Sequence, residues 1–294
     1  MRIANLSGRA VLIHQGHAVD IAGASSGRFG PAPRAIFDAW DEFTHWSAST
    51  ELPVGDEFDP AALGPPIPDP RQIFAIGLNY RDHADEAGLA YPEHIVVFTK
   101  FASSLAGPEA KVTLPSAFVD FETELVVVVG SESHRLRSLE DARLAIAGYA
   151  VGQDYSERAV QLRGPVPQFS LGKSYPAFAP FGPAVVTRDE LGDPDSLRIT
   201  ARITGPTAEA QGASPFTLQD GSTADLIFSV EQVIHDLSQV VTLYPGDLIF
   251  TGTPAGVGGT RGIFLQPGDR LISTIDGIGS LDNRFIDGAG PDSR

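Results

Sequence analysis

The sequence predicts a β-rich α+β protein. Short strand-like runs such as "VVFTKF", "ELVVVVG", "GPAVVT", "DLIFTGT" and "DRLISTIDG" recur after residue 95, and Gly or Pro separates many of them. Convincing helical segments are fewer, namely 138–150 and 222–241. The 294 residues are 42% hydrophobic and include 31 Gly and 23 Pro, a composition typical of a globular protein with many loops.

The elements before residue 95 indicate an appended N-terminal unit. Residues 1–24 alternate like short strands, and "GRFGPAPRAIFDAWDEF" indicates a turn that leads into a helix. The stretch "LGPPIPDPRQ" has four prolines, so we place a boundary there, between an appendage at 1–64 and a main domain at 65–294. Next, "IFAIGLNY" predicts a buried strand, and "RDHADEAG" predicts a short helical turn closed by Gly88.

Charge and composition exclude several classes of partner. Asp and Glu number 37 against 21 Lys and Arg, so the net charge of −16 argues against nucleic acid and anionic membranes. A small anionic substrate would need a local positive centre, such as a metal ion or a lysine. The absence of cysteine excludes disulfides and thiolate chemistry. Neither a signal peptide nor an apolar run of membrane-spanning length is evident, so we expect a cytoplasmic protein.

An acidic strand is predicted at "FVDFETELVVVVG", residues 118–130. In an extended strand Asp120, Glu122 and Glu124 share one face, just before a buried valine run. Three acids at a solvated strand edge are the ordinary alternative. For Glu122 and Glu124 together we favour a ligand pair for a hard cation such as Mg²⁺, Mn²⁺ or Ca²⁺, because uncompensated like charges raise one another's pKa.

The segment "GQDYSERAVQ" follows the predicted helix at 138–150. Asp154 is a candidate third carboxylate, but taken by itself a turn or a helix N-cap is the favoured interpretation, since aspartate is a preferred cap residue. Arg158 and Gln161 would share a face if a helix begins here. These two side chains either orient an anionic substrate or simply cap and pack.

A candidate general base lies in "GLNYRDHADEAG". His83 and Glu86 are three residues apart, so they are neighbours on a helical turn. A carboxylate beside an imidazole fixes its tautomer and raises its basicity, which suits proton abstraction from water. An exposed or otherwise satisfied histidine is the alternative.

Two further segments carry candidate substrate contacts. Lys173 lies among aromatic, Pro and Gly residues, where its charge is costly to bury unless it meets an anion. The loop "TGTPAGVGG" lacks the lysine of a phosphate-binding loop. Its backbone amides and the hydroxyls of Thr251 and Thr253 either cradle a carboxylate or form a plain tight turn.

Taken together and in this order, seven stretches resemble the fumarylacetoacetate hydrolase family. They span roughly residues 70–285 and read "IGLNYRDHADEAG", "FTKFASSLAGP", "VDFETELVVVVG", "GYAVGQDYSERAVQ", "LGKSYPAFAPFGP", "GDLIFTGTPAGVG" and "LQPGDRLISTIDGIGSLDNRF". The resemblance implies a mixed β-sandwich roll, assembled as a homodimer. It also implies Mg²⁺ or Mn²⁺ held by three carboxylates, which fall on Glu122, Glu124 and Asp154, with Asp120 in a supporting role.

The resemblance also implies roles for the remaining candidates. The family's catalytic pair falls on His83 and Glu86, within a segment that acts as a mobile lid, and its lysine falls on Lys173. Substrate contacts are expected from Gln161 and the Thr253 loop. Departures from the family pattern occur at Gln153, where Asn is common, and at Pro176 and Ala177, where Asp-Thr is common; they leave the shape of the pocket open.

Three functions are compatible with these residues. The first is a hydrolase that cleaves the C3–C4 bond of a 2,4-dioxo acid of the acylpyruvate or fumarylpyruvate type to pyruvate and a carboxylic acid. The second is oxaloacetate decarboxylation, or isomerisation or tautomerisation of an oxo-diacid, on the same metal site. The third is a non-catalytic protein that binds a small acid on this fold. The intact histidine–glutamate pair favours hydrolysis.

Overall fold

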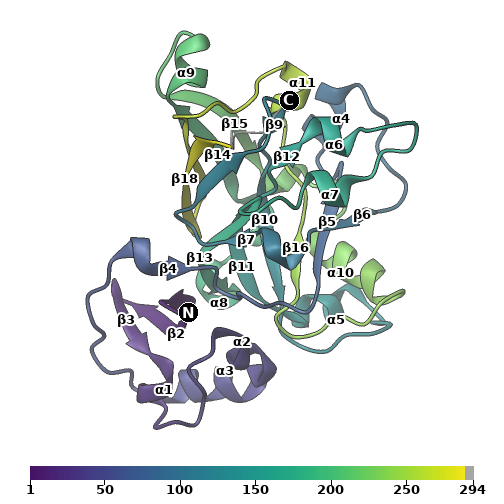
Figure 1. The fold of residues 1–294 in the computed structure, drawn as a ribbon. Helices are drawn as coiled ribbons and strands as arrows, with labels where there is room; N and C mark the ends of the chain where they lie inside the picture. The colour runs from purple at the N-terminus through teal and green to yellow at the C-terminus, as the bar shows by residue number, and fades with distance from the viewer. Residues whose placement is uncertain (289–294) are drawn as a thin grey trace.

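The computed structural model describes residues 1–288, and within them two mixed sheets dominate the fold (Figure 1). The large sheet has the order β3-β2-β1-β13-β11-β10-β16-β5-β6, with β4 beside β1 and β7 beside β13. Its strands are β1 (Arg2–Leu6), β2 (Arg9–His14), β3 (His17–Asp20), β4 (Leu63–Gly64), β5 (Ile73–Gly77), β6 (Val96–Thr99), β7 (Leu105–Ala106), β10 (Thr123–Val129), β11 (Ile146–Gln153), β13 (Ala179–Thr187) and β16 (Leu248–Phe250).

The second sheet has the order β15-β14-β17-β18-β8, and β9 pairs with β12 in a separate ribbon. These strands are β8 (Lys111–Leu114), β14 (Arg198–Thr204), β15 (Phe216–Ser222), β17 (Arg270–Ile275), β18 (Gly279–Asp287), β9 (Val119–Asp120) and β12 (Ser156–Glu157). The predicted β-rich α+β class is therefore confirmed.

The helices are short and lie around the sheets (Figure 1). They are α1 (Ile21–Ala24), α2 (Pro33–Asp38), α3 (Trp40–Ser49), α4 (Arg81–Ala87), α5 (Leu139–Leu144), α6 (Arg158–Gln161), α7 (Phe169–Gly172), α8 (Arg188–Leu191), α9 (Pro206–Ala210), α10 (Val230–Ser238) and α11 (Gly258–Arg261), with 3-10 turns η1 (Pro60–Ala62), η2 (Ala102–Ser104), η3 (Pro194–Ser196) and η4 (Thr223–Asp225).

The predicted helix at 138–150 is wrong beyond residue 144. α5 ends at Leu144, and the following residues form β11, a strand at the centre of the large sheet. Its glycines permit close strand packing: a Cβ on Gly148 would lie 2.5 Å from the Val186 carbonyl oxygen, and one on Gly152 would lie 2.4 Å from Val126 Cγ2. The small residues that looked helical therefore serve sheet packing instead.

The predicted helix at 222–241 is narrower than expected. Residues 223–225 form the 3-10 turn η4, and the α-helix begins only after Ser229, whose side chain accepts a hydrogen bond from the Gln232 N–H. Asn79 holds the intervening loop, because its Oδ1 accepts from the Phe228 N–H at 2.8 Å. A capping serine, rather than hydrophobic periodicity, sets where this helix starts.

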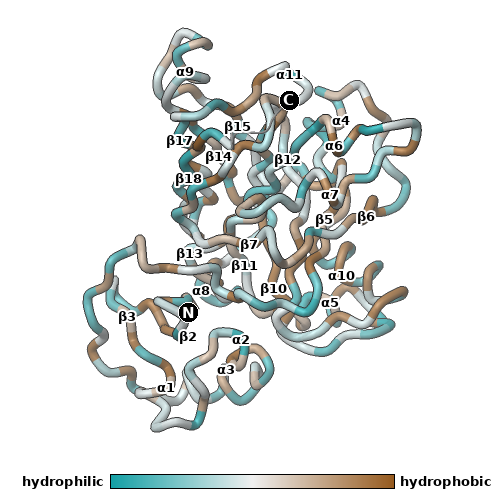
Figure 2. The backbone as a smooth tube through the Cα atoms, viewed as in Figure 1, coloured by the Kyte–Doolittle hydropathy of each residue, from teal (hydrophilic) through white to brown (hydrophobic). Residues whose placement is uncertain are grey.

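β10 is an inner strand of the large sheet, and both of its faces are buried. It pairs antiparallel with β11 on one side and with β16 on the other, and β16 runs parallel to β5. Hydrophobic residues colour this region brown in Figure 2. A strand covered on both faces needs a continuous apolar run, as the four consecutive valines at 126–129 provide.

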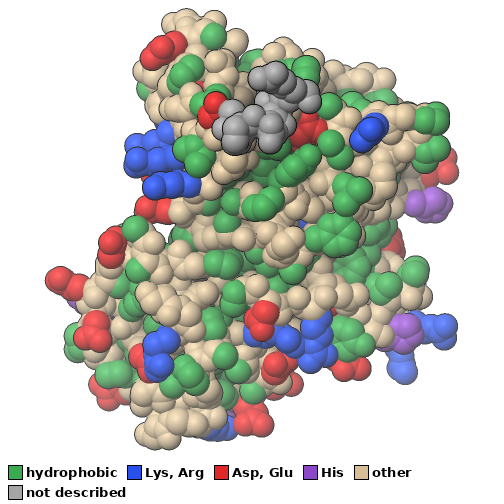
Figure 3. All heavy atoms as spheres, viewed as in Figure 1, with side chains coloured by type: hydrophobic (Ala, Val, Ile, Leu, Met, Phe, Trp, Pro, Cys, Tyr) green, Lys and Arg blue, Asp and Glu red, His purple; other side chains and the backbone are tan. Residues whose placement is uncertain are grey.

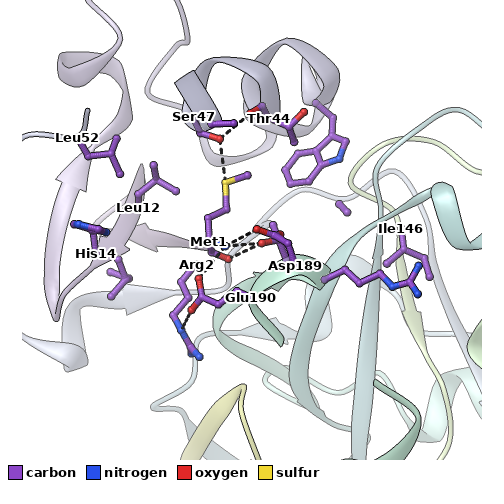
Figure 4. Close-up of a pocket in the computed structure, with 16 residues that line it drawn as sticks. Met1, Arg2, Leu12, His14, Thr44, Ser47, Leu52, Ile146, Asp189 and Glu190 are labelled. Atoms are coloured by element: carbon purple, nitrogen blue, oxygen red, sulfur yellow. Dashed lines mark hydrogen bonds and ion pairs between the residues drawn. The ribbon is translucent and has the colours of Figure 1, made fainter. Parts of the chain in front are cut away.

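The N-terminal lobe joins the large sheet through β1, which pairs antiparallel with β13. A cavity of about 520 Å³ lies at this junction (Figure 4). Beside it the Met1 amino group is 2.8 Å from a Glu190 oxygen and donates to Thr187 Oγ1 at 2.5 Å. The boundary near residue 64 stays a prediction, and residues 289–294 of the predicted main domain lie outside the described residues.

Acidic side chains are scattered over the face of the molecule shown in Figure 3, in keeping with the net charge of −16. Among residues 1–288, no helix has the length and apolar character needed to cross a membrane. The cytoplasmic location stays a prediction.

Candidate active site

Three carboxylates meet at one end of the central strands β10 and β11. Glu124 lies in β10, Glu122 immediately precedes that strand, and Asp154 directly follows the antiparallel β11. One oxygen from each lies within 4.8 Å of the others, and all three side chains are buried. The structure thus brings together the three residues assigned to a metal. Asp154, however, lies at the end of a strand and not of a helix.

The acidic segment is not one continuous strand, because residues 121–122 separate β9 from β10. Buried glutamine side chains bond the backbone at this break. The Glu122 N–H donates to Gln153 Oε1 at 3.0 Å, and the Thr123 N–H donates to Gln219 Oε1 at 3.0 Å. The departure at Gln153 therefore has a structural use. The matching role of Gln219 has no signal in the sequence.

Two buried lysines neutralise part of this acidity. Lys173 Nζ lies 2.5 Å from Glu122 Oε2 and 2.5 Å from Asp154 Oδ2. Lys100 Nζ donates to the other oxygen of Asp154 and to the backbone carbonyl of Lys173. Buried ammonium groups are stable only when such partners surround them. Sequence reasoning missed Lys100, although a lysine inside the apolar run "VVFTKF" was a signal for a buried charge.

Arg158 is the third cation of the cluster and begins α6. Its Nε lies 2.8 Å from Asp120 Oδ1, and its NH2 nitrogen lies 2.5 Å from Glu122 Oε1. Its NH1 nitrogen also donates to Gln161 Oε1 at 2.7 Å, so the predicted shared face of the two residues exists. The guanidinium is committed to protein carboxylates. Its contact with a substrate stays a prediction.

Glu124 has no ion pair among the described residues, and its Oε2 accepts a hydrogen bond from the Gly252 N–H at 2.8 Å. Burial first, and then the neighbouring Asp154 and Glu122, raise the pKa of Glu124 well above its usual range. The cluster holds four carboxylates and three cations, a formal charge of −1 with every group ionised: Asp120, Glu122, Glu124, Asp154, Lys100, Arg158 and Lys173. A buried carboxylate without a cation beside two others fits a hard divalent ion such as Mg²⁺, Mn²⁺ or Ca²⁺.

The other two acids have opposite shifts. Burial raises the pKa of Asp120 to about 6 even though Arg158 opposes it. Burial alone would also raise the pKa of Glu122, but Lys173 and Arg158 lower that pKa below its usual range. Lys173 and Arg158 therefore keep Glu122 ionised, whereas neither of them forms an ion pair with Glu124.

α4 carries the predicted general base. It ends at Ala87 and is closed, as the sequence predicts, by Gly88, whose φ of 65° lies in the left-handed region. His83 Nδ1 lies 3.8 Å from Glu86 Oε2, and the same Glu86 oxygen accepts from the Gly256 N–H at 3.0 Å. Glu86 therefore ties α4 to the loop that follows β16. The catalytic roles of this pair stay predictions.

The hydroxyls of that loop hold it against β10. Thr253 Oγ1 donates to the Thr123 carbonyl at 2.8 Å and accepts from Gln219 Nε2 at 2.8 Å, and Thr251 Oγ1 donates to the Leu125 carbonyl at 2.9 Å. The side-chain donors are thus used within the protein. Contact of Thr253 with a substrate stays a prediction.

A cavity of about 490 Å³ opens beside the carboxylate cluster. Pro176 and Ala177, where the sequence departs from the family pattern, are not among the described residues that line it. Seven predicted site residues line it together: His83, Glu122, Glu124, Arg158, Gln161, Lys173 and Thr253. A large concave pocket with a few convergent polar groups is the arrangement of a small-molecule site.

Comparison with known proteins identifies the family. Residues 72–286 match the Fumarylacetoacetate (FAA) hydrolase C-terminal family. The chain is 38% identical over 242 residues to the human protein named oxaloacetate tautomerase FAHD2A, mitochondrial. This match covers 81% of this chain and 73% of the human protein. The chain belongs to the fumarylacetoacetate hydrolase family, as the seven stretches predicted, and the family's members are enzymes.

Solved structures of relatives match nearly all of the chain, and two of them illustrate this. A candidate HpcE protein from Mycobacterium smegmatis is 47% identical, with a TM-score of 0.90, and the match covers 98% of this chain and 100% of that one. Maleylpyruvate hydrolase from Sphingobium sp. SYK-6, in complex with manganese (II) ion and pyruvate, is 27% identical, with a TM-score of 0.77 and coverage of 98% and 100%.

Proposed function

We propose that the protein is a divalent-metal-dependent hydrolase that cleaves the C3–C4 bond of a 2,4-dioxo acid of the acylpyruvate type. The observation that carries the proposal is one cavity lined by His83 and by Glu122 and Glu124, two of the three clustered carboxylates. The maleylpyruvate hydrolase neighbour, with its manganese and pyruvate, supports Mn²⁺ or Mg²⁺ as the ion. Glu122, Glu124 and Asp154 would hold it.

A bound dication supplies positive charge that stabilises negative charge on the oxygens of a 2-oxo acid. The protein's own residues account for the remaining chemistry. His83, with Glu86 at 3.8 Å, takes a proton from water, and the water oxygen adds to the C4 carbonyl. Lys173 places an ammonium group beside the cluster, where it favours the anionic intermediate. The C3–C4 bond then breaks, and its electrons and one proton pass to C3, which gives pyruvate and a carboxylic acid.

Tautomerisation or decarboxylation of oxaloacetate is the second candidate. It is favoured by the name of the human relative, oxaloacetate tautomerase, at 38% identity. These reactions also develop negative charge on a 2-oxo acid, but they require no attacking water. The same carboxylates would serve them, and His83 would move a proton to or from carbon.

Metal removal and one variant test the proposal. We expect EDTA to abolish pyruvate release from acetylpyruvate, and Mg²⁺ or Mn²⁺ to restore it. His83→Ala should lower kcat for hydrolysis by about 10²- to 10⁴-fold, the usual contribution of a general base. Wild-type hydrolysis by His83→Ala would rule out this role. Activity confined to oxaloacetate would select the second candidate.

A further inference from the structure

The cavity beside the carboxylates has an apolar wall. Phe98 of β6 begins it, with the centre of its ring 4.9 Å from Lys173 Nζ. Phe169 of α7 continues it, because its ring packs edge-on against Phe98 with centroids 5.6 Å apart. Leu89, Leu162 and Phe264 also line the cavity. Aromatic and aliphatic side chains thus line this cavity together with the charged cluster.

This wall offers no uncommitted cation to a second carboxylate. Lys173 and Arg158 are the lysine and arginine that line the cavity within residues 1–288, and both are engaged by protein carboxylates at 2.5–2.8 Å. His83, the remaining basic residue of the lining, lies beside Glu86. A terminal carboxylate on the substrate would therefore lose its hydration without gaining an ion pair. An alkyl or aryl group loses nothing there and gains contact.

The size of the cavity points the same way. Its volume of about 490 Å³ lies within the range of roughly 300–1,000 Å³ that holds drug-sized ligands. A four-carbon diacid would leave most of that space to water against apolar walls. A longer acyl chain would displace this water.

We propose that the preferred substrate carries an apolar acyl or aryl group beyond C4, and not a terminal carboxylate, and that Phe98, Leu162 and Phe169 form its subsite. This inference rests on the proposed function for the reacting end of the substrate. It goes beyond it by assigning the far end. Each buried methylene then strengthens binding by up to about fourfold.

Binding of unreactive 2-oxo acids tests the subsite without any turnover. Calorimetry on the Mg²⁺-loaded protein compares pyruvate, 2-oxohexanoate, 2-oxooctanoate and 2-oxoadipate, the last of which is 2-oxohexanoate with a terminal carboxylate. We expect Kd to fall from pyruvate to 2-oxohexanoate and again to 2-oxooctanoate. For 2-oxoadipate we expect a Kd at least tenfold higher than for 2-oxohexanoate. Equal or tighter binding of 2-oxoadipate overturns the proposal.

A positive charge introduced into the apolar wall, compared with the same charge introduced outside the cavity, gives a matched pair of variants. Leu162 is 58% exposed and lines the cavity, whereas Leu171, 63% exposed on α7, does not line it. Leu162→Arg should reverse the preference between 2-oxohexanoate and 2-oxoadipate, and Leu171→Arg should leave it unchanged. An unchanged preference in Leu162→Arg excludes this wall as the subsite.

Turnover separates this inference from the proposed function. Hexanoylpyruvate should have a higher kcat/KM than adipoylpyruvate, its counterpart with a terminal carboxylate. If neither is hydrolysed while 2-oxooctanoate still binds more tightly than pyruvate, the hydrolase proposal fails and the subsite stands. If both are hydrolysed equally well, the subsite fails and the hydrolase stands.

Discussion

Glu122 and Glu124 lie two residues apart, yet the protein surrounds their charges differently. Glu122 meets Lys173 and Arg158, each at 2.5 Å, whereas Glu124 meets only the Gly252 N–H among the described residues. Burial without a paired cation makes the ionised form of Glu124 costly. This cost raises the pKa of Glu124 above its value in the unfolded chain.

The two neutral variants should therefore act in opposite directions on the metal-free protein. Glu124→Gln removes an uncompensated charge and should raise the free energy of unfolding by roughly 1 kcal/mol at neutral pH. Glu122→Gln leaves two cations short of a partner and should lower it by about 3 kcal/mol. Thermal unfolding in EDTA measures both. A lower melting temperature for Glu124→Gln contradicts this account.

The same pair should behave alike toward metal. Each variant loses one anionic oxygen ligand, so each should weaken Mn²⁺ binding by at least tenfold in a calorimetric titration. Unchanged Mn²⁺ affinity in either variant would remove that residue from the proposed ligand set.

Lys100 holds two site residues through its ammonium group, which donates to Asp154 and to the Lys173 carbonyl. Lys100→Met should leave an Asp154 oxygen and the Lys173 carbonyl without their donor, at a cost of about 3 kcal/mol in unfolding free energy. Lys111→Met is the control, since Lys111 is exposed on β8 and should change stability by less than about 0.5 kcal/mol. Equal denaturant midpoints for the two variants would show that Lys100 has no such role.

The sequence was a good guide to which residues meet and a poor guide to how they are held. Motif order predicted that Glu122, Glu124 and Asp154 would gather, and the structure places them together. The supporting contacts are long-range: Lys100 is 54 residues from its partner Asp154, and Gln219 is 96 residues from its partner Thr123. Such contacts depend on tertiary structure and leave no local pattern to read.

At the level of elements, β11 shows why periodicity misleads. "LAIAGYAVG" has the small residues of a packed helix, but the strands on either side of β11 require its glycines for close approach. Burial of all eight residues of β11 removes the alternation that identifies a half-exposed strand. A short element buried on both faces is ambiguous without its neighbours.

Gly148→Ala tests the packing of β11 against β13. The added Cβ would lie 2.5 Å from the Val186 carbonyl oxygen, so the strands must separate, and we expect a loss of about 3 kcal/mol in unfolding free energy. Gly30→Ala is the control, because nothing lies within 4 Å of the added Cβ. Chemical denaturation compares the two. A neutral effect of Gly148→Ala would contradict the register of these strands.

For the molecule as a whole, β6 leaves one edge of the large sheet unpaired in the described part of the chain. Val96 and Val97 on this strand are 42% and 45% exposed, and the nearby Phe101 is 49% exposed. An exposed apolar edge strand favours pairing with another chain. It supports the expected homodimer, which stays a prediction.

Light scattering tests the dimer. The wild-type protein should have twice the chain mass of 31.1 kDa, and Val97→Lys should shift it toward the monomer, because a lysine at the edge disfavours strand pairing. Val240→Lys, at a residue that is 81% exposed outside this edge, should leave the mass unchanged. A monomeric wild-type protein would refute the prediction.

Hydrolysis of a C–C bond at this site is tested most directly by product analysis with NMR. Acetylpyruvate and oxaloacetate are each incubated with the Mg²⁺-loaded protein and with its His83→Ala variant. We predict that the wild-type protein releases acetate and pyruvate from acetylpyruvate in equal amounts, and that the variant releases neither at a comparable rate. Conversion of oxaloacetate between its keto and enol forms, with acetylpyruvate left intact, would contradict the account.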